Sequence, residues 1–456
     1  MSDEPAGNEP KQTPVFDPDA AHMVRPKLRA VRGFPLQANG PDGQPKPLLG
    51  LADARQISDR IVATAPAFQV VLPMLDGSRS VDQIVTEVGR GLQTDQLQGF
   101  VAQLDDAGLL EGPTFEALEN KLHQQFDETD ILPPGKTAEY ADQLVMAAMG
   151  QEATDEQKAA EGPNRLRAWL DECMNKALES AQKPSYDALP AVLVAPQADY
   201  RLAWPNYAAA WGRARVVDRP DRVIVLGTNN FGACTGVCGC DKGFASPLGE
   251  SMVDAELVGK LRNSLGDKFF ESRFDHEREH SVEAQMPWIH HCLGAGEDGA
   301  FPMIFAALVH DPAVNNGESY DGNGVSLEGF VEAVRGAIGE LGGKTLIVVS
   351  ADLSHVGRAY GDQMPLVGED EEAKSFRDTV VRTDRDHLTS IQDGKLDELI
   401  TTIAWQQNPT RWNSLGSLVA AHKIAQPSKT EVLNYMAAVD QQGISLVSSA
   451  AMAMFA

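Results

Sequence analysis

Short, continuous apolar runs alternate with helical patterns after Pro190. Apolar runs without polar interruptions are typical of strands buried on both faces of a sheet. Five are predicted: Ala191–Ala195, Val223–Leu226, Met303–Val309, Thr345–Val349 and Val432–Met436. Helical spacing recurs between them in Asp254–Gly266, His280–Leu293 and Leu327–Leu341. The alternation predicts an α/β domain over residues 189–456, with a mixed, mostly parallel sheet, helices on both faces and Ile444–Phe455 as the candidate closing strand.

A different pattern precedes this domain. Apolar residues keep helical spacing from Val81 to Val88 behind a Ser80 cap, and a second such segment opens at Thr94. These features predict a helix-turn-helix with its turn at Gly89–Gln93. The short apolar segment Ala107–Pro113 follows, as the wing does in winged-helix domains. Residues 25–113 are therefore predicted to form a small N-terminal winged-helix domain.

The second predicted helix has no basic residue and carries Asp95, Asp105 and Asp106. A DNA-binding domain needs Lys or Arg on this helix to contact phosphates, so we expect no DNA binding.

Residues 1–24 contain little to bury and predict a flexible tail. From Asp105 to Glu161 there are fourteen acidic and three basic residues. Residues 114–188 therefore predict an acidic helical linker, with a solvated connector favoured over an acidic docking tail.

Composition narrows the function classes. The chain has 456 residues and a formal net charge of −26, which repels nucleic acid and anionic membranes. It has neither a leader pattern nor an apolar run long enough to span a bilayer, so we expect a cytoplasmic protein. Five cysteines are too few and odd in number for a secreted disulfide framework.

Polar residues follow several predicted strands, and ligands of open α/β sheets collect at such strand ends. Gln197, Asn230 and Asp440 are the candidate pocket residues. Asp352 and His355, three positions apart, follow another strand and are candidate catalytic residues. Polar residues at these positions serve either as packing caps or as site residues.

The densest polar motif is Glu279-His-Ser-Val-Glu-Ala-Gln-Met-Pro-Trp288. His280 and Glu283 are three apart and share a helix face, where the carboxylate is expected to orient the imidazole or to join it in proton transfer. An N-terminal cap beside a solvated histidine is the alternative interpretation. We predict that His280, Glu283, Asp352 and His355 line one pocket at the carboxyl ends of the strands.

Cys234, Cys238 and Cys240 lie within seven residues. Thiolates bind zinc and other thiophilic metals, but this spacing does not match the usual paired knuckles. A metal site, a redox pair and free thiols in a Gly-rich loop remain open.

The strand-end motifs together resemble the Memo family, to which the B component of the AmmeMemoRadiSam system belongs. The resemblance covers about Ala191 to Phe455 and rests on the order of five motifs: Ala195-Pro-Gln-Ala-Asp-Tyr200, Val223-Ile-Val-Leu-Gly-Thr228, Asp241-Lys-Gly-Phe-Ala-Ser-Pro-Leu-Gly249, Glu279-His-Ser-Val-Glu-Ala-Gln-Met-Pro287 and Ser350-Ala-Asp-Leu-Ser-His-Val-Gly357. It implies a fold similar to class III extradiol dioxygenases of the LigB type. It also implies a strand-end pocket that in some members holds iron or copper.

This chain departs from the family at the implied metal ligands. Where the family has two histidines and a cysteine, the chain has Gln197, Asn230 and a segment Ala438-Val-Asp-Gln441 without cysteine. Neutral amides are poor ligands for such metals. We therefore expect the family's metal site to be lost or strongly weakened here.

Residues 25–113 resemble the PqqD-type peptide chaperones, through Leu75-Asp-Gly-Ser-Arg-Ser80 and Leu104-Asp-Asp-Ala-Gly-Leu-Leu110. That resemblance implies binding of a peptide as an added strand, on behalf of a radical enzyme. The leading hypothesis is a Memo-like pocket protein fused to a peptide-recognition module in a modification pathway. The alternatives are a metal-dependent, dioxygenase-like oxidoreductase that uses His280, His355 and Asp352, and a non-catalytic scaffold.

Overall fold

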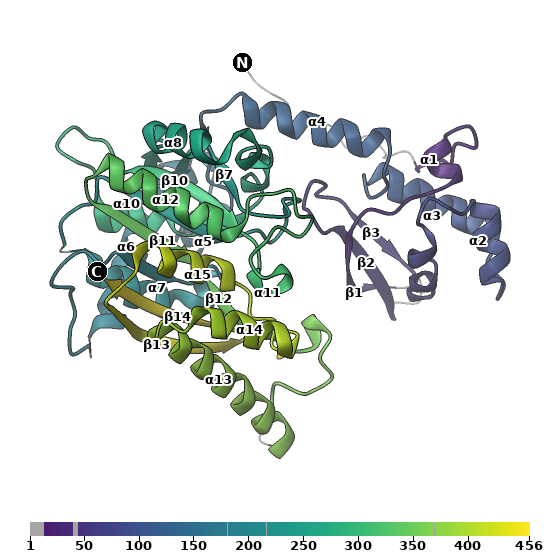
Figure 1. The fold of residues 1–456 in the computed structure, drawn as a ribbon. Helices are drawn as coiled ribbons and strands as arrows, with labels where there is room; N and C mark the ends of the chain where they lie inside the picture. The colour runs from purple at the N-terminus through teal and green to yellow at the C-terminus, as the bar shows by residue number, and fades with distance from the viewer. Residues whose placement is uncertain (1–12, 40–43, 180, 216, 369) are drawn as a thin grey trace. The chain divides into compact units, whose positions relative to one another are not determined.

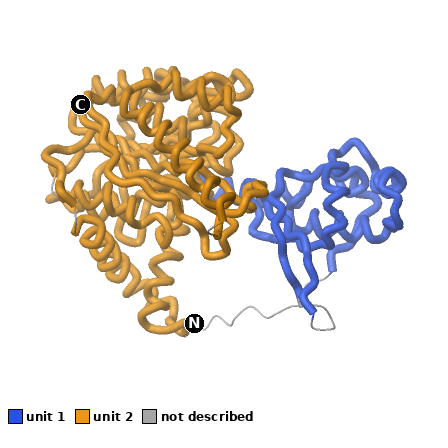
Figure 2. Tube along the Cα trace, turned by 90° about the horizontal axis from the view of Figure 1, so that it is seen from below, with its two compact units in different colours: residues 1–128 blue, residues 129–456 orange. Residues whose placement is uncertain are grey.

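The computed structural model describes residues 13–39, 44–179, 181–215, 217–368 and 370–456. The chain divides into two compact units, residues 1–128 and 129–456 (Figure 2). Residues 1–12 of the predicted tail lie outside the described residues. The rest of that tail contains helix α1 (Ala21–Val24), whose Met23 is buried in the core of the smaller unit with Phe16 and Ala20 packed against it. Folded structure thus begins before Arg25, because these apolar side chains have a core to join.

The smaller unit contains an antiparallel sheet that the sequence pattern did not predict. Its strands, in spatial order, are β1 (Val31–Asn39), β2 (Pro45–Asp53) and β3 (Ile61–Thr64). Helices α2 (Val81–Val88) and α3 (Thr94–Asp106) confirm the predicted helix pair, and a capping box joins Ser80 to Gln83. Helix α4 (Pro113–Asp127) completes the unit.

The predicted wing at residues 107–113 is wrong in this structure. Gly108 turns the chain after α3 with a φ of 68°, Leu110 makes a single bridge to Leu28, and Pro113 begins α4. Proline suits the first turn of a helix because the N–H that it lacks would have no helical partner there. The chain therefore enters a helix at the end of the segment where a short wing strand was expected, and a winged-helix domain is not shown.

The larger unit is built on an eight-stranded sheet. Seven strands follow the order β12-β14-β5-β11-β6-β10-β7, and β13 pairs with β14. Their bounds are β5 (Val192–Ala195), β6 (Arg222–Thr228), β7 (Cys238–Cys240), β10 (Met303–Val309), β11 (Thr345–Ser350), β12 (Asp352–Val356), β13 (Lys429–Val439) and β14 (Leu446–Phe455). Every strand predicted from the apolar runs lies in this sheet.

The sheet is mixed, but it is not mostly parallel as predicted. β5, β11, β6 and β10 run parallel at its centre, whereas β7, β12, β13 and β14 pair antiparallel. β13 and β14 are joined by a turn over residues 440–445, and so short a connection allows only antiparallel pairing. β13 is also half-buried rather than buried on both faces, and among the described residues it pairs only with β14.

Helices cover both faces of this sheet (Figure 1). Val192 and Val194 of β5 join one apolar core with residues of α12, α14 and α15, while α7 contacts β5, β13 and β14. The helix bounds are α5 (Lys136–Met149), α6 (Asp155–Leu178), α7 (Tyr200–Ala214), α8 (Ala255–Leu265), α9 (His280–Glu283), α10 (Met286–Leu293), α11 (Pro312–Asn315), α12 (Leu327–Leu341), α13 (Glu371–Gln392), α14 (Leu396–Gln406) and α15 (Leu415–Ala425). The predicted helix at 280–293 is therefore two helices.

Residues 114–188, predicted as a linker, contain α4, α5 and α6. α4 belongs to the smaller unit, whereas α5 packs on α6 and α6 on α7 in the larger one. A small sheet of β4 (Ile131–Leu132), β8 (Gly243–Ser246) and β9 (Gly249–Ser251) also joins this segment to the larger unit. No helix among the described residues has both the length and the apolar character needed to cross a membrane.

Candidate functional site

A cavity of about 420 Å³ lies beside the carboxyl ends of the central parallel strands. Gln197 follows β5, Asn230 follows β6, and Asp352 follows β11, and all three line the cavity. His280, from the start of α9, and His355, from β12, line it as well. The remaining lining residues are Ala198, Asp199, Leu202, Ala203, Phe231, Tyr360, Asn413, Met436, Ala438, Val447 and Ser449.

Three side-chain amides form a closed ring in the cavity wall. The Gln197 amide donates to Asn413 at 3.0 Å, Asn413 donates to Asn230 at 3.3 Å, and Asn230 donates to Gln197 at 3.2 Å. The Gln197 nitrogen also lies 3.4 Å from the hydroxyl oxygen of Ser414. Each amide thus has both a donor and an acceptor partner, which holds the wall in one arrangement.

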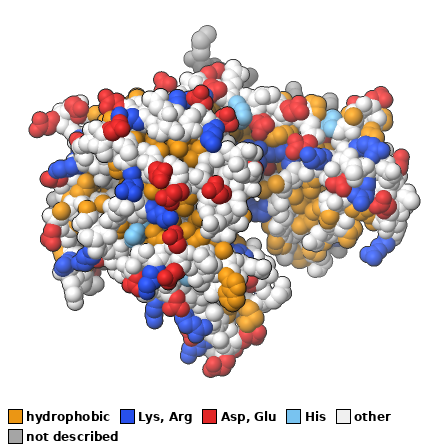
Figure 3. Space-filling model, viewed as in Figure 1, with side chains coloured by type: hydrophobic (Ala, Val, Ile, Leu, Met, Phe, Trp, Pro, Cys, Tyr) orange, Lys and Arg blue, Asp and Glu red, His pale blue; other side chains and the backbone are white. Residues whose placement is uncertain are grey.

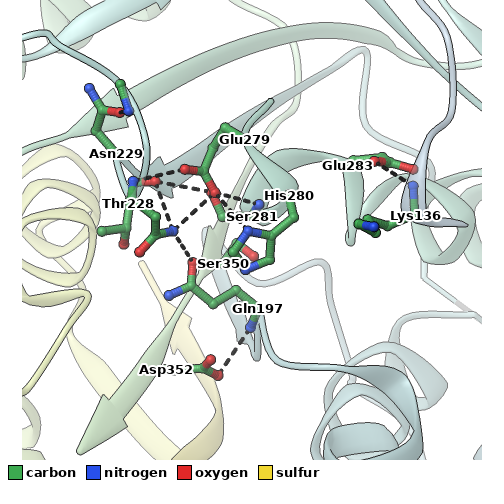
Figure 4. Close-up of polar contacts among 12 residues, drawn as sticks. Lys136, Gln197, Thr228, Asn229, Glu279, His280, Ser281, Glu283, Ser350 and Asp352 are labelled. Carbon is green, nitrogen blue, oxygen red and sulfur yellow. Dashed lines mark hydrogen bonds and ion pairs between the residues drawn. The ribbon is translucent and has the colours of Figure 1, made fainter. Parts of the chain in front are cut away.

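Glu279 links this amide ring to His280. Its carboxylate accepts hydrogen bonds from the backbone N–H of Asn230 at 2.8 Å and from the Asn230 side chain at 3.0 Å. Its Oε1 also lies 3.3 Å from Nδ1 of His280 and accepts from the backbone N–H of Ser281 (Figure 4). The Glu279 side chain is fully buried, so these donors replace the water that a carboxylate needs. The arrangement directs Nδ1 of His280 to Glu279 and leaves Nε2 to meet a ligand.

Asp352 is a buried carboxyl with an altered acidity. Burial raises its pKa to about 6, although the interaction with His355 and the backbone N–H groups of Gln197 and Ala198 act in the opposite direction. Those N–H groups donate to Oδ1 at 3.2 and 3.3 Å. Because its pKa is near neutrality, Asp352 can both hold and release a proton.

His355 is oriented by the backbone of its own strand. Its Nδ1 lies 3.1 Å from the carbonyl oxygen of Leu353, which can only accept, so Nδ1 carries the proton. The Tyr360 ring packs edge-on against the imidazole, with the ring centres 5.4 Å apart. In the neutral imidazole the lone pair is then on Nε2, where it can serve as a general base.

Glu283, predicted to work with His280, lies outside the cavity. Figure 4 shows its carboxylate directed toward Lys136 and away from His280. It accepts hydrogen bonds from the backbone N–H groups of Gly135, Lys136 and Thr137 and from the Thr137 hydroxyl. A carboxylate at these positions caps the N-terminus of α5 and matches the positive end of the helix dipole. Glu279 holds the place beside His280 that the spacing suggested for Glu283.

Asp440, predicted as a pocket residue, closes the β13–β14 hairpin. Its Oδ1 accepts from the backbone N–H groups of Ile444 at 2.8 Å and Ser445 at 3.1 Å. Ala438, two residues before it on β13, reaches the cavity in its place. An Asp that binds the backbone of its own turn is a common closing device.

The cysteine cluster does not line the cavity either. Cys234 lies in the segment after β6, and Cys238 and Cys240 lie in β7. In the part of the chain that the structure describes, no three or more His, Cys, Asp or Glu side chains are arranged to hold a metal ion.

The donor set of the cavity therefore does not fit the iron or copper that the family resemblance implies. The two positions where that resemblance places histidines, Gln197 and Asn230, hold neutral amides bound to each other. Amide oxygens suit hard cations better than soft or borderline metals. No metal-dependent step follows from these residues.

Several residues of the site escaped the sequence interpretation, and of these Asn413 lines the cavity. Asn413 and Ser414 precede α15, and backbone bonds to Leu353 at 3.0 Å and Asp352 at 3.3 Å bring them to the site. Two polar residues just before an apolar helix were the available signal. Glu279 was part of a quoted motif, and its position immediately before a helix start marked it as a capping residue.

Comparisons with known proteins match most of the larger unit to one protein family. A family model described as Memo-like protein matches residues 158–453. A MEMO1 family protein of Aquifex aeolicus is 24% identical over 344 residues, which cover 74% of this chain and 78% of the relative. A MEMO1 family protein of Desulfurococcus amylolyticus is 27% identical over 200 residues, or 42% of this chain. The chain spans 64% of that relative's length, just under two thirds.

Proposed function

Because this chain belongs to the Memo-like family, we propose that its larger unit is a Memo-type pocket protein that binds a small polar molecule through hydrogen bonds rather than through a metal ion. The main support for this proposal is the amide ring of Gln197, Asn230 and Asn413. Two of its members, Gln197 and Asn230, stand where the family resemblance implies metal ligands. The surrounding histidines and Asp352 supply groups that bind hydroxyl or carbonyl oxygens.

The same cavity supports proton transfer. His355 presents a basic Nε2, and Asp352 presents a carboxyl whose pKa of about 6 lies near neutrality. A base and an acid with such different surroundings are the usual pair for moving a proton on and off a bound molecule. His280, backed by the Glu279 carboxylate, would stabilise negative charge that develops on the ligand.

The smaller unit is proposed as a peptide-recognition module. β1 pairs only with β2 among the described residues, so its other edge has unpaired N–H and C=O groups that an extended peptide could meet. Phe34 and Leu36 lie over Gly50 on the sheet face opposite the buried Leu51, and Ile61 is 56% exposed. Hydrophobic side chains gather over this sheet in Figure 3. The apolar face would receive alternate side chains of the bound strand.

Together, the two units suggest a role in peptide modification alongside a radical enzyme. This part of the proposal rests on the sequence resemblance of residues 25–113 to PqqD-type chaperones. The free β1 edge supplies its physical basis.

The pocket proposal is tested by anaerobic titration with ferrous and cuprous ions. We expect no tight, stoichiometric site that depends on Gln197 or Asn230, because both amides already hold each other. If Gln197→Ala or Asn230→Ala abolished a tight site, the metal-dependent oxidoreductase would replace the proposed function.

The peptide proposal is tested by panning a displayed library of ten-residue peptides against the full chain. Recovered peptides should bind Phe34→Ser about tenfold more weakly, since one packed aromatic ring carries an energy of that order. The exposed Val15→Ser serves as the matched control. Peptides that bind both variants and the parent chain equally would contradict use of this sheet.

A further inference from the structure

The amide ring in the cavity wall leaves one hydrogen-bond donor unused. Asn230 donates both of its side-chain N–H hydrogens, to Gln197 at 3.2 Å and to Glu279 at 3.0 Å. The Gln197 amide donates to Asn413 at 3.0 Å, and its nitrogen lies 3.4 Å from the Ser414 hydroxyl oxygen. Asn413 donates only to Asn230 among the described residues, so one of its N–H hydrogens remains for a ligand.

The ring also has unused acceptors. Each amide oxygen has two lone pairs. In the described structure Gln197 Oε1 accepts only from Asn230, and Asn230 Oδ1 accepts only from Asn413, so each keeps a second lone pair. Asn413 Oδ1 differs, because it accepts both from Gln197 and from the Ser414 hydroxyl at 3.2 Å. The ring therefore offers a ligand more acceptors than donors.

The titratable side chains of the cavity add further acceptors. Nδ1 of His280 and Nδ1 of His355 already face acceptors, which leaves the Nε2 lone pair of each neutral imidazole. Asp352 accepts two backbone N–H groups on Oδ1, and no hydrogen bond from a described residue reaches its Oδ2. The hydroxyls of Tyr360 and Ser449 can either donate or accept, so they do not change this excess of acceptors.

The charges around the cavity favour a cation. Asp199 and Asp352 line it, whereas no Lys or Arg lines it in the part of the chain that the structure describes. Asp199 already pairs with the exposed Arg201 at 2.6 Å. Asp352 is buried, and its pKa of about 6 leaves it mostly ionised at pH 7.5. A buried carboxylate without a counterion is costly, so a bound cation would stabilise it.

The remaining wall is largely apolar. Its apolar residues come from the segment after β6 and from α7, β13 and β14: Phe231, Leu202, Ala203, Met436, Ala438 and Val447. Such surface is best covered by the hydrocarbon part of a ligand. The volume of about 420 Å³ lies within the usual range of small-molecule pockets.

We propose that the cavity binds a primary amine with an apolar body and a hydroxyl beside the amine, an inference that rests on the proposed metal-free pocket function. A primary ammonium has three N–H donors and no acceptor, which matches the excess of acceptors and the charge of Asp352. The neighbouring hydroxyl oxygen accepts from the unused N–H of Asn413. A carboxylate ligand has only acceptors, so it would face lone pairs and the Asp352 charge.

The experiment titrates the full-length chain with phenylalaninol by calorimetry at pH 7.5 in the presence of EDTA. The alcohol 3-phenylpropan-1-ol lacks only the amine, and 3-phenylpropanoate carries a negative charge instead. We expect phenylalaninol to bind about tenfold more tightly than the alcohol, because charge-assisted hydrogen bonds are the stronger ones, and we expect no binding of the anion. Equal or weaker binding of phenylalaninol, or preferred binding of the anion, would overturn the inference.

A variant locates the ammonium. Asp352→Asn removes the negative charge and should weaken phenylalaninol binding about tenfold, while the affinity for 3-phenylpropan-1-ol stays within about twofold. The matched control Asp378→Asn removes an exposed carboxylate and should change neither affinity. Unchanged phenylalaninol binding in Asp352→Asn, or an equal loss for both ligands, would contradict an ammonium at this position.

Failure of this inference differs from failure of the proposed function. If 3-phenylpropan-1-ol bound and phenylalaninol did not, the amine would be excluded and the metal-free pocket would stand. If the ligands bound only after anaerobic addition of ferrous or cuprous ions without EDTA, the proposed function would fail as well. A titration without binding of any of the three ligands would overturn the inference.

Discussion

Oε1 of Glu279 lies 3.3 Å from Nδ1 of His280, while Glu283, three residues further on, binds the start of α5. Two carboxylates of one motif thus have separate tasks, one in the cavity wall and one in joining two helices. Substituting each carboxylate separately can therefore distinguish these tasks.

Replacing Glu279 should loosen the cavity wall. Glu279→Gln keeps the size but removes the charge that accepts from Asn230 and Ser281, so we expect a loss of about 1–2 kcal/mol in unfolding free energy. Hydrogen exchange at residues 229–234 should also speed up. The exposed Glu250→Gln is the control and should change little. Unchanged exchange in Glu279→Gln would contradict a role for this carboxylate in holding the loop.

Replacing Glu283 should destabilise the larger unit without changing the cavity. Glu283→Gln leaves one oxygen to accept from the several donors at residues 135–137, at a cost of about 1–2 kcal/mol in denaturant unfolding. Glu139→Gln, which removes an exposed carboxylate from the same helix, should cost about 0.5 kcal/mol or less. A cavity role for Glu283 would instead appear as altered ligand binding at unchanged stability.

Asp352 should make stability depend on pH in a defined window. Its pKa is raised from 3.8 to about 6 in the folded chain, so the folded state binds the proton more tightly than the unfolded state. Its favourable contribution is complete below pH 4 and is lost as pH rises through about 6. Asp352→Asn keeps the acceptor oxygen and should exceed the wild-type stability by about 3 kcal/mol at pH 7.5, converging with it near pH 4.

Thermal unfolding at several pH values measures this difference. The exposed Asp378→Asn serves as the control, and its difference from wild type should stay nearly constant. If wild type instead became increasingly more stable than Asp352→Asn as the pH rose, the stability difference would have the opposite sign. That result would exclude a raised pKa for Asp352.

Histidines at the two amide positions should restore metal affinity. The double variant Gln197→His with Asn230→His replaces two linked amides by imidazoles that favour iron and copper. Anaerobic titration followed by metal analysis should then find one bound metal per chain. Gln392→His, on the exposed surface, controls for stray imidazole binding. Absence of binding in the double variant would show that the cavity rejects the metal for another reason.

The smaller unit should fold alone when cut at its observed end. Phe115 of α4 is buried under the guanidinium of Arg29, 3.5 Å from the ring centre. Residues 1–128 should therefore unfold cooperatively, while the unfolding free energy of residues 25–113 should be several kcal/mol lower.

A shift assay of the smaller unit with duplex DNA at low salt should show no complex, because α3 has no basic side chain. Steeply salt-dependent binding would reject that expectation.

The sequence pattern predicted the sheet of the larger unit well because its strands are continuous apolar runs, such as Met303–Val309, which matches β10 at both ends. It missed β1 and β2, where Pro35, Gly50 and scattered polar residues interrupt the apolar alternation. These strands are held by pairing along their length, which a local pattern does not report.

From the sequence, only the site residues that directly follow the parallel strands could be predicted. Gln197, Asn230 and Asp352 follow strands that end at one sheet edge, so their meeting follows from parallel pairing. Asn413 is more than fifty residues from β12 in the sequence, and a backbone hydrogen bond to Leu353 of β12 brings it to the cavity. Glu283 points away from the cavity because the N-terminus of α5, far earlier in the chain, offers it backbone N–H groups. The two polar residues before α15 mark a helix start, but no local signal shows which distant elements Asn413 and Glu283 contact.

The amide ring also has a sense of circulation. Donation runs from Gln197 to Asn413 to Asn230 and back, and a reversal would require all three amides to turn over together. Glu279 prevents this, because its carboxylate can only accept and therefore holds the NH₂ end of Asn230 toward itself. Glu279, which is not a member of the ring, thus sets the direction of its hydrogen bonds. A ligand therefore meets amide donors and acceptors at fixed positions in the cavity wall.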